Sequence, residues 1–306
     1  MNREITAIVC TLNRSDLLDT CVRSLLAQSL ENDRYRILIV DNGSTDSTPQ
    51  RCRVYLAEHG IRSVHEPNPG LSHSRNTGWR EADTEFVGYI DDDAVADRDW
   101  LKDALHCFTS TDPAPDWVGG PIDLDCERPL PGWIDAELQV PLGRVDYGAE
   151  PREIRGAERL GGGNSFFRRD VLEDVGGFNP ELGRRGKSLL SAEETELQHR
   201  LRARGARLVY HPGVRISHHV PLDRLQPRWF YRRYWWGGYS DAVMARALHD
   251  VQYVPVGGEV SKDSQFMRLV QNTVAAMSLS SDPARRIRGR IYLSYVMGSI
   301  VGKIRG

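Results

Sequence analysis

Features that would mark several large protein classes are missing from this 306-residue sequence. Its five cysteines show no Cys-x-x-Cys spacing, which argues against a zinc cage or a disulfide framework and fits a reducing cytosol. No run of about 18 uninterrupted apolar residues occurs, so we expect no membrane-spanning helix. The N-terminus also lacks the basic region and apolar core of a secretion signal, and we therefore expect a cytoplasmic protein.

A strong excess of charge of either sign is missing as well. The formal net charge is −2, whereas a dedicated nucleic-acid-binding domain is usually strongly basic, so we expect no nucleic-acid partner. The positive charge is unevenly spread, however, because six cations crowd the last part of the chain: Arg285, Arg286, Arg288, Arg290, Lys303 and Arg305. That end is suited to meeting an anionic surface.

The first half of the sequence alternates short apolar runs with amphipathic segments. The runs at residues 5–10, 36–40 and 86–90 read as buried strands, and residues 17–26, the segment after Pro49 and residues 71–82 read as helices. Ser15 or Asp16 is available to cap the first helix. This alternation predicts an α/β fold with a mostly parallel sheet flanked by helices.

Polar side chains follow three of the predicted strands. Thr11 and Asn13 follow the first, Asp41 follows the second, and the third ends in three consecutive aspartates, Asp91, Asp92 and Asp93. Ligands bind at the carboxyl edge of such sheets, and hard carboxylate oxygens suit Mg2+ or Mn2+. The alternative is a solvated acidic turn before the next helix, with Asp97 as its N-cap.

The second half is less regular. Residues 112–163 are rich in Pro and Gly with little periodicity and predict an irregular region with short strands. A short helix from Arg169, a stronger one at residues 192–204 and a strand at residues 208–210 follow. Beyond Pro221 the pattern predicts long helices with many aromatic residues and arginines. We therefore predict a catalytic domain at residues 1–220 and a helical C-terminal extension at residues 221–306.

The extension has two interpretations. Aromatic residues lie beside cations in the segment 229–236, and apolar residues lie among cations in the tail after Arg285. This combination is typical of a helix that lies in the headgroup plane of a membrane. Aromatic and Arg side chains also favour protein interfaces, so packing on the catalytic domain or on a second copy in a homo-oligomer is the alternative.

Five motifs in order resemble the signatures of one enzyme family. They are Thr11-Leu12-Asn13-Arg14, residues 40–46 (VDNGSTD), residues 68–76 (NPGLSHSRN), Asp91-Asp92-Asp93 and residues 193–197 (EETEL). The ordered set, spread over residues 5–219, resembles family 2 glycosyltransferases with the GT-A fold, which is Rossmann-like. The resemblance implies a nucleotide-sugar donor, most simply a UDP-sugar, and a glycan or glycolipid acceptor.

The resemblance also implies roles for individual residues. Thr11, Asn13 and Asp41 match positions that line the base and ribose pocket, Arg75 approaches the nucleotide, and Asp91 lies near the ribose. The full set implied to bind the nucleotide sugar is Thr11, Asn13, Arg14, Asp41, Asn68, Arg75, Asp91 and Asp92. For Asn42 and Ser44, turn formation is an equal alternative. The glycines at positions 161–163 resemble a stretch that lines the acceptor and donor-sugar pocket.

The metal ligands implied by the resemblance are Asp93, from the DxD motif, and His218. His219 and His211 compete for the second place. Carboxylate and imidazole together suit Mn2+ better than Mg2+.

The family usually has Glu-Asp where this chain has Glu193-Glu194. An inverting transfer needs a base that removes the proton from the acceptor hydroxyl, and a carboxylate at a helix start can serve. Glu194 replaces the usual aspartate with a side chain one methylene longer, which leaves the base open between Glu194 and Glu193. Alternatively, both glutamates only complement the helix dipole.

These observations together predict an inverting, metal-dependent glycosyltransferase that works at the cytoplasmic face of a membrane. A nucleotidyltransferase would normally have a Gly-rich phosphate loop where Thr11-Leu12-Asn13-Arg14 stands. A glycosidase would leave the nucleotide pocket unexplained. A non-catalytic carbohydrate-binding protein would not need both the aspartate triplet and the glutamate pair.

Overall fold

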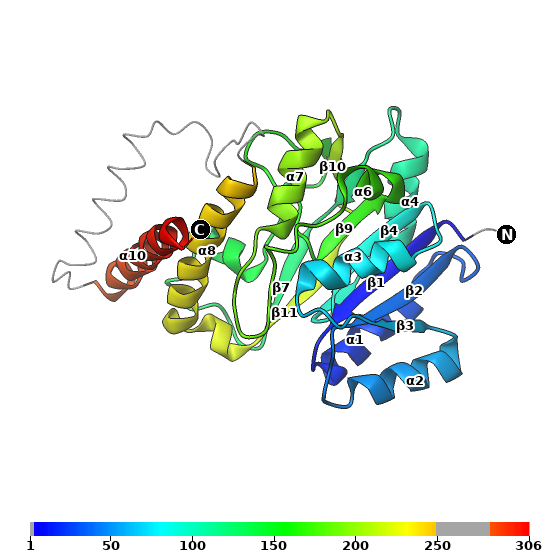
Figure 1. Cartoon of the computed structure of the whole chain (residues 1–306), viewed down its shortest axis with the longest axis horizontal. Coiled ribbons are helices and arrows are strands. Elements are labelled where there is room, and N and C mark those ends of the chain that lie inside the picture. Colours follow the sequence, from blue (N-terminus) through cyan, green and yellow to red (C-terminus); the bar gives the residue numbers. More distant parts are fainter. Residues whose placement is uncertain (1–2, 249–281, 306) are drawn as a thin grey trace.

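A central sheet flanked by helices on both faces forms the body of the molecule (Figure 1). The computed structural model describes residues 3–248 and 282–305. The eight strands of the sheet follow the order β3-β2-β1-β4-β9-β6-β10-β8. Their bounds are β1 Ile5–Thr11, β2 Tyr35–Asp41, β3 Arg62–His65, β4 Phe86–Asp91, β6 Trp117–Gly119, β8 Arg152–Glu153, β9 Asn164–Arg168 and β10 Leu208–Tyr210.

Side chains alternate along the central strands and feed two separate cores. On β1, Ile5, Ala7 and Val9 enter one core, whereas Ile8 enters the other, as the two-residue period of a strand requires. The first core contains side chains of α1 Ser15–Leu26, α2 Thr48–His59 and α4 Trp100–Ser110. The second contains side chains of α3 Leu71–Glu81, α6 Arg169–Val175 and α7 Glu193–Ala203. Burial on both faces explains the continuous apolar runs of the central strands.

The predicted parallel sheet is confirmed in the first half of the chain, where β3, β2, β1 and β4 run parallel. The sheet is mixed beyond β4, because β9 runs antiparallel between β4 and β6. A second, three-stranded sheet has the order β5-β11-β7, formed by β5 Ala94–Ala96, β7 Ile122–Cys126 and β11 Ile216–Val220. Residues 112–163 hold short elements as expected, including α5 Ala136–Gln139 and the 3-10 turn η1 Val140–Leu142.

Two predicted helix caps were wrong. Helix α1 begins at Ser15, but neither Ser15 nor Asp16 caps it, because Arg14 occupies the capping position. Instead, the carboxylate of Asp46 accepts a hydrogen bond from the Ser15 backbone N–H at 3.3 Å, from a loop 31 residues away. At α4 the residue before the helix is Asp99 and not Asp97. The backbone carbonyl oxygen of Asp97 accepts a hydrogen bond from the Trp100 N–H.

The C-terminal part is a pair of long helices that lie beside the sheet and run parallel to one another (Figure 1): α8 Pro227–Ala247, which follows the 3-10 turn η2 Leu222–Leu225, and α10 Pro283–Ile304. Glycines allow the two backbones to meet. A Cβ atom on Gly298 would lie 1.8 Å from the Trp235 carbonyl oxygen, and one on Gly238 would lie 2.0 Å from that of Tyr295. Trp229 and Phe230 are buried with Ile291 in a third core, so this part of the aromatic segment serves packing.

The predicted division at residue 220 stays a prediction, and residues 249–281 of the predicted extension lie outside the described residues. None of the helices within the described ranges is both long enough and apolar enough to cross a membrane.

Candidate active site

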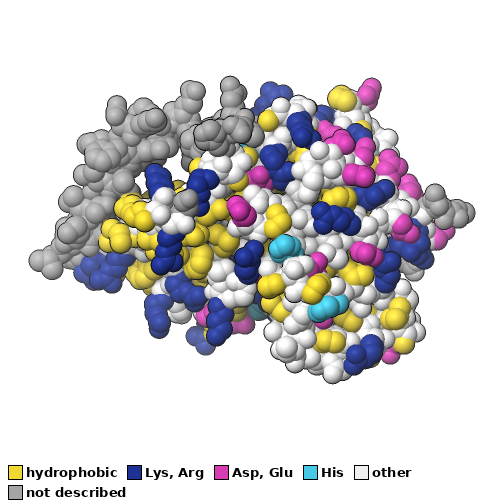
Figure 2. Space-filling view, in the orientation of Figure 1, with side chains coloured by type: hydrophobic (Ala, Val, Ile, Leu, Met, Phe, Trp, Pro, Cys, Tyr) yellow, Lys and Arg dark blue, Asp and Glu magenta, His cyan; other side chains and the backbone are white. Residues whose placement is uncertain are grey.

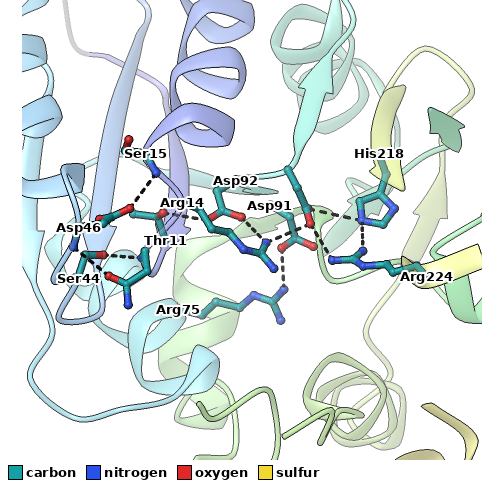
Figure 3. Close-up of polar contacts among 12 residues, drawn as sticks. Thr11, Arg14, Ser15, Ser44, Asp46, Arg75, Asp91, Asp92, His218 and Arg224 are labelled. Atoms are coloured by element: carbon teal, nitrogen blue, oxygen red, sulfur yellow. Dashed lines mark hydrogen bonds and ion pairs between the residues drawn. The ribbon is translucent and has the colours of Figure 1, made fainter. Parts of the chain in front are cut away.

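A large cavity opens at the edge of the sheet where β1 and β4 end. Its volume is 1730 Å³, and its walls include the aspartate triplet, the start of α7 and one side of α10. Of the twelve residues predicted from the sequence to form the site, nine line this cavity: Thr11, Arg14, Arg75, Asp91, Asp92, Asp93, Glu193, Glu194 and His218. Figure 3 shows Thr11, Arg14, Arg75, Asp91, Asp92 and His218 converging from separate elements.

The aspartates of the triplet have different surroundings. Asp92 is buried, and its carboxylate accepts hydrogen bonds from the Thr11 hydroxyl and the Arg14 guanidinium, both at 2.8 Å. Burial raises the pKa of Asp92 to about 6, against the opposing charge of Arg14. Thr11, Arg14 and Asp92 thus form a bonded set within the protein (Figure 3), and their predicted contact with a nucleotide stays a prediction.

Asp93 is surrounded by cationic groups. Its carboxylate lies 3.0 Å from Arg14, 3.1 Å from Arg224 and 3.5 Å from Nε2 of His218. Burial alone would raise the pKa of Asp93, but the His218 hydrogen bond and the charges of His218, Arg14 and Arg224 outweigh it and hold this pKa well below its ordinary value. Asp93 therefore stays ionised, as a metal ligand must be.

His218 reaches Asp93 through the small sheet. Strand β11 pairs with β5 so that His218 stands opposite Ala94, and the Asp93 carbonyl oxygen accepts a hydrogen bond from the His219 N–H. Because side chains alternate along a strand, His219 turns the other way and lies 3.4 Å from Glu127. Nδ1 of His211 accepts a hydrogen bond from the Gly213 N–H. Of the three histidines, the structure brings His218 to the aspartates.

The residues present fit a divalent ion. Within the described ranges no group of three or more His, Cys, Asp or Glu side chains is arranged to hold a metal by itself. A carboxylate oxygen and an imidazole nitrogen are nonetheless provided together, and Nδ1 of His218 is buried without a hydrogen-bond partner. Two protein ligands suit an ion whose remaining positions are taken by phosphate oxygens and water.

The loops after β1 and β2 hold one another in place. The side-chain oxygen of Asn13 accepts hydrogen bonds from the backbone N–H groups of Thr45 and Asp46, and Asp41 accepts one from the Ser44 N–H at 2.9 Å. Asn13 itself has φ of 55°, a left-handed conformation that asparagine tolerates.

The next loop is fixed in a similar way. The Asn42 amide donates to the carbonyl oxygens of Glu66 and Asn68, and Asn68 donates to the Glu66 carboxylate. The turn-forming alternative for Asn42 and Ser44 therefore accounts for their observed partners. Nucleotide contact by Asn13, Asp41 and Asn68 stays a prediction.

Arg75 connects the aspartates to helix α7. Its buried guanidinium lies 2.6 Å from the Glu193 carboxylate and 3.5 Å from Asp91 (Figure 3 shows the Asp91 contact). Close approach depends on glycine: a Cβ on Gly162 would stand 3.0 Å from the Arg75 guanidinium, and one on Gly163 would stand 2.3 Å from the Asp91 carboxylate. Arg75 thus faces protein carboxylates, and its predicted contact with a nucleotide stays a prediction.

The two glutamates at the start of α7 differ in their surroundings. Glu193 is buried against Arg75, and its second oxygen, Oε2, has no hydrogen-bond partner. Burial and then the charge of Glu194 raise the pKa of Glu193 to about 7, although Arg75 opposes them. Glu194 is only half-buried, lines the cavity, and takes part in no ion pair among the described residues. Glu194 is therefore the glutamate that is open to a ligand.

Four arginines that were not among the predicted site residues also line the cavity: Arg159, Arg184, Arg224 and Arg233. Arg224 binds Asp93, whereas no carboxylate lies within ion-pairing distance of the other three in the part of the chain that the structure describes. Burial, and then the charges of Arg233 and Arg224, lower the pKa of Arg184 to about 10. They lie outside the five shared motifs, among many other arginines of the sequence, so no local signal marked them.

Comparison with known proteins gives a consistent result. The family model described as Glycosyl transferase family 2 matches residues 6–176. A glucosyl-dolichyl phosphate glucuronosyltransferase of Haloferax volcanii is 25% identical over 98% of this chain and 94% of its own length. The succinoglycan biosynthesis protein ExoM of Rhizobium meliloti is 26% identical over 80% of this chain and 76% of its own length.

Solved structures share the fold. A mannosyltransferase of Pyrobaculum calidifontis, in complex with GDP-Man and Mn2+, has a TM-score of 0.68 at 19% identity and covers 99% of this chain and 88% of its own. TarS of S. aureus in complex with UDP has a TM-score of 0.55 at 17% identity and covers 99% of this chain and 92% of its own.

Proposed function

The chain belongs to glycosyl transferase family 2 and has the GT-A fold, and from this premise we propose that it is an inverting, metal-dependent enzyme. It transfers a sugar from a nucleotide donor, a UDP-sugar, to a hydroxyl group of a glycan or glycolipid. Glu194 is the base, and Asp93 and His218 are the metal ligands. The enzyme acts at the cytoplasmic face of a membrane.

The observation that carries this proposal is the meeting of three distant segments in one cavity. The register of β5 and β11 places His218 beside Asp93, at 3.5 Å, although 125 residues separate them in sequence. Helix α7 begins at the same cavity with Glu193 and Glu194. A site that only bound a sugar would need neither a metal-binding pair nor a carboxylate opposite it.

The contrast between the glutamates supports Glu194 as the base. Glu193 is engaged by Arg75, so it holds the start of α7 against the aspartate edge, whereas Glu194 faces the cavity. In the reaction, the acceptor hydroxyl oxygen forms a bond to the anomeric carbon while the bond from that carbon to the diphosphate oxygen breaks. The hydroxyl proton passes to Glu194, and the nucleoside diphosphate leaves with the electron pair.

A bound Mn2+ or Mg2+ would supply Lewis-acid stabilisation of the charge on the departing diphosphate. Arg14 and Arg224 hold the Asp93 carboxylate in the structure, so Asp93 must exchange at least one guanidinium contact to accept an ion. Arg184 has no carboxylate within ion-pairing distance among the residues that the structure describes, so it is suited to an anionic phosphate oxygen.

The choice of UDP rests on TarS, which was solved with UDP, while the Pyrobaculum enzyme was solved with GDP-Man. Thermal unfolding with UDP, GDP and dTDP, each with and without Mn2+, tests both the nucleotide and the metal, because a ligand of the native state raises the unfolding temperature. We expect a Mn2+-dependent shift that is largest with UDP.

Asp93→Asn and His218→Ala should weaken Mn2+-dependent UDP binding while the fold stays intact. Arg23→Gln, a change to an exposed residue of α1, is the matched control. If both site variants keep the affinity of the unchanged protein for Mn2+ and UDP, the metal assignment is wrong. Release of nucleoside diphosphate with an acceptor then separates transfer from simple binding.

A further inference from the structure

The cavity extends beyond Glu193 and Glu194. It continues to helix α10, where Tyr295, Val296, Ser299, Ile300 and Lys303 form part of its wall. On the other side it is lined by residues of η1, among them Val140, which is 64% exposed. One continuous space of 1730 Å³ therefore joins the aspartate edge to the C-terminal helix.

Helix α10 exposes a line of large apolar side chains, which we call the α10 stripe: Leu293, Met297, Ile300 and Ile304, exposed by 37%, 49%, 47% and 77%. Their spacing of four, three and four residues places them on one face of the helix. Gly298 and Gly302 face α8, so that side of α10 is already covered. Figure 2 shows hydrophobic side chains gathered over the C-terminal helices. Ile300 belongs to both the stripe and the cavity wall.

The charge of α10 points to one kind of partner. The helix contains no Asp or Glu between Pro283 and Ile304, while Arg290 and Lys303 are exposed on it and Arg305 follows. Figure 2 shows Lys and Arg side chains beside the apolar ones. An exposed apolar face next to cations, with no acidic residue, is complementary to a bilayer of anionic lipids.

Two arginines of the cavity have no carboxylate within ion-pairing distance in the described part of the chain. Nη2 of Arg159 is buried and has no hydrogen-bond partner, and Nη1 reaches only the neutral Thr195 hydroxyl, at 3.3 Å. Arg233 donates to the neutral Ser191 hydroxyl at 3.0 Å. Burial lowers the pKa of Arg233, with Glu194 and Glu193 opposing it. The charge of Asp241, which also lines the cavity, acts on both arginines, but its carboxylate accepts a hydrogen bond from the Tyr295 hydroxyl and burial raises its pKa. Partly buried cations that lack an ion-pairing carboxylate favour an anionic ligand.

We propose, building on the transferase function above, that the acceptor is a phosphate-linked lipid glycan drawn from an anionic membrane. Its sugar hydroxyl meets Glu194, its phosphate meets Arg159 and Arg233, and its apolar chain leaves the cavity over the α10 stripe. The stripe and its neighbouring cations seat the enzyme on the bilayer in which that chain is held.

Vesicle flotation tests whether the α10 stripe binds the membrane. The full chain should float with phosphatidylcholine vesicles that contain phosphatidylglycerol at low salt, and less with pure phosphatidylcholine. Leu293→Asp with Met297→Asp should reduce this binding by at least about tenfold, because two apolar side chains no longer enter the lipid. Neither residue lines the cavity, so UDP and Mn2+ binding should be unchanged. The matched control is Val54→Asp with Leu56→Asp, two exposed apolar residues of α2.

Equal flotation of the stripe variant and the control would show that the α10 stripe does not bind the membrane. A wild-type chain that ignores anionic vesicles, but changes from dimer to monomer in light scattering when the stripe is altered, would assign the stripe to a second copy of the chain instead. Arg290→Gln offers a second test that leaves the apolar face intact and should weaken flotation at low salt alone.

Calorimetry with farnesyl phosphate, farnesol and inorganic phosphate tests the acceptor class. Farnesyl phosphate should bind tightest, and Arg159→Gln or Arg233→Gln should weaken it by about tenfold with little effect on farnesol. Arg233→Lys should restore part of the loss. If farnesol binds as well as farnesyl phosphate, or inorganic phosphate binds as well as either, the proposal fails. Loss of all three probes with UDP and Mn2+ binding retained rejects the lipid acceptor and leaves the transferase function standing.

Discussion

The arginines at the two ends of the cavity, the aspartate edge and the end toward α10, have different partners. At the aspartate edge, Arg14, Arg75 and Arg224 are each within 3.5 Å of a carboxylate. Toward α10, Arg159 and Arg233 have hydroxyl groups as their hydrogen-bond partners. These three arginines of the first region are paired within the protein, whereas Arg159 and Arg233 have no carboxylate within ion-pairing distance among the described residues.

This difference indicates that the paired arginines position side chains, whereas the unpaired arginines are suited to binding a ligand. Buried ion pairs hold side chains in one arrangement, and breaking one of them is costly. Replacing an arginine that has no carboxylate partner should cost the protein little stability. The same replacement should weaken the binding of a ligand that supplies the missing anion. The paired end should therefore control stability and geometry, whereas the unpaired end should control the choice of acceptor.

The largest expected effect concerns Glu194, which stands between the two ends. Glu194→Gln keeps the size and the helix position but cannot accept a proton, so turnover should fall by roughly 10²- to 10⁴-fold. Donor binding should be largely retained, which calorimetry with UDP and Mn2+ checks.

Glu193→Gln is the comparison variant, because Glu193 is the neighbouring carboxylate. Near-normal turnover in Glu194→Gln together with a collapse in Glu193→Gln would transfer the role of base to Glu193. A loss of donor binding in Glu194→Gln would instead point to a binding role.

The second prediction compares one arginine from each end. Arg75→Met leaves the Glu193 carboxylate buried without its cation, and the free energy of unfolding should fall by about 3–5 kcal/mol. Arg233→Met removes a cation that forms no ion pair with the described residues, so the free energy of unfolding should change little or rise.

Urea unfolding of both variants measures the difference. Arg23→Met, at an exposed pair with Asp19, should change stability by less than about 1 kcal/mol and serves as the surface control. Equal losses in Arg75→Met and Arg233→Met would contradict the division of the cavity into a paired and an unpaired end.

The paired end could largely be predicted from the sequence, because local motifs encode it. Apolar runs followed by carboxylates predict the strands that end in Asp41 and Asp91, and all the predicted strands of the first half are found. His218 could be suggested only by the family resemblance, since the register of β11 against β5 is a long-range contact.

The unpaired end could not be predicted, for physical reasons. Arg159 comes from an irregular segment and Arg233 from a helix, and tertiary packing that no periodicity encodes brings both to the wall of the cavity. The cap of α1 escaped prediction for the same reason, since Asp46 reaches Ser15 from another loop. Sequence patterns describe neighbours along the chain, whereas these contacts join distant segments.

The smallest expected effect is the pH dependence caused by Glu193 in the paired end. Burial, and then the charge of Glu194, raise its pKa from 4.5 to about 7, so the native state holds this proton more tightly than the unfolded state does. The contribution of Glu193 to stability is therefore fully present below pH 4.5 and is lost as the pH rises to about 7, by about 3 kcal/mol in total. Glu193→Gln does not titrate, so its free energy of unfolding relative to the unchanged protein should rise between pH 5 and pH 7 and then level off. Urea unfolding at pH 5, 6, 7 and 8 measures this difference. Two curves that stay parallel across this range would show that Arg75 neutralises Glu193 fully, which would make the pairing at this end of the cavity stronger than the structure indicates.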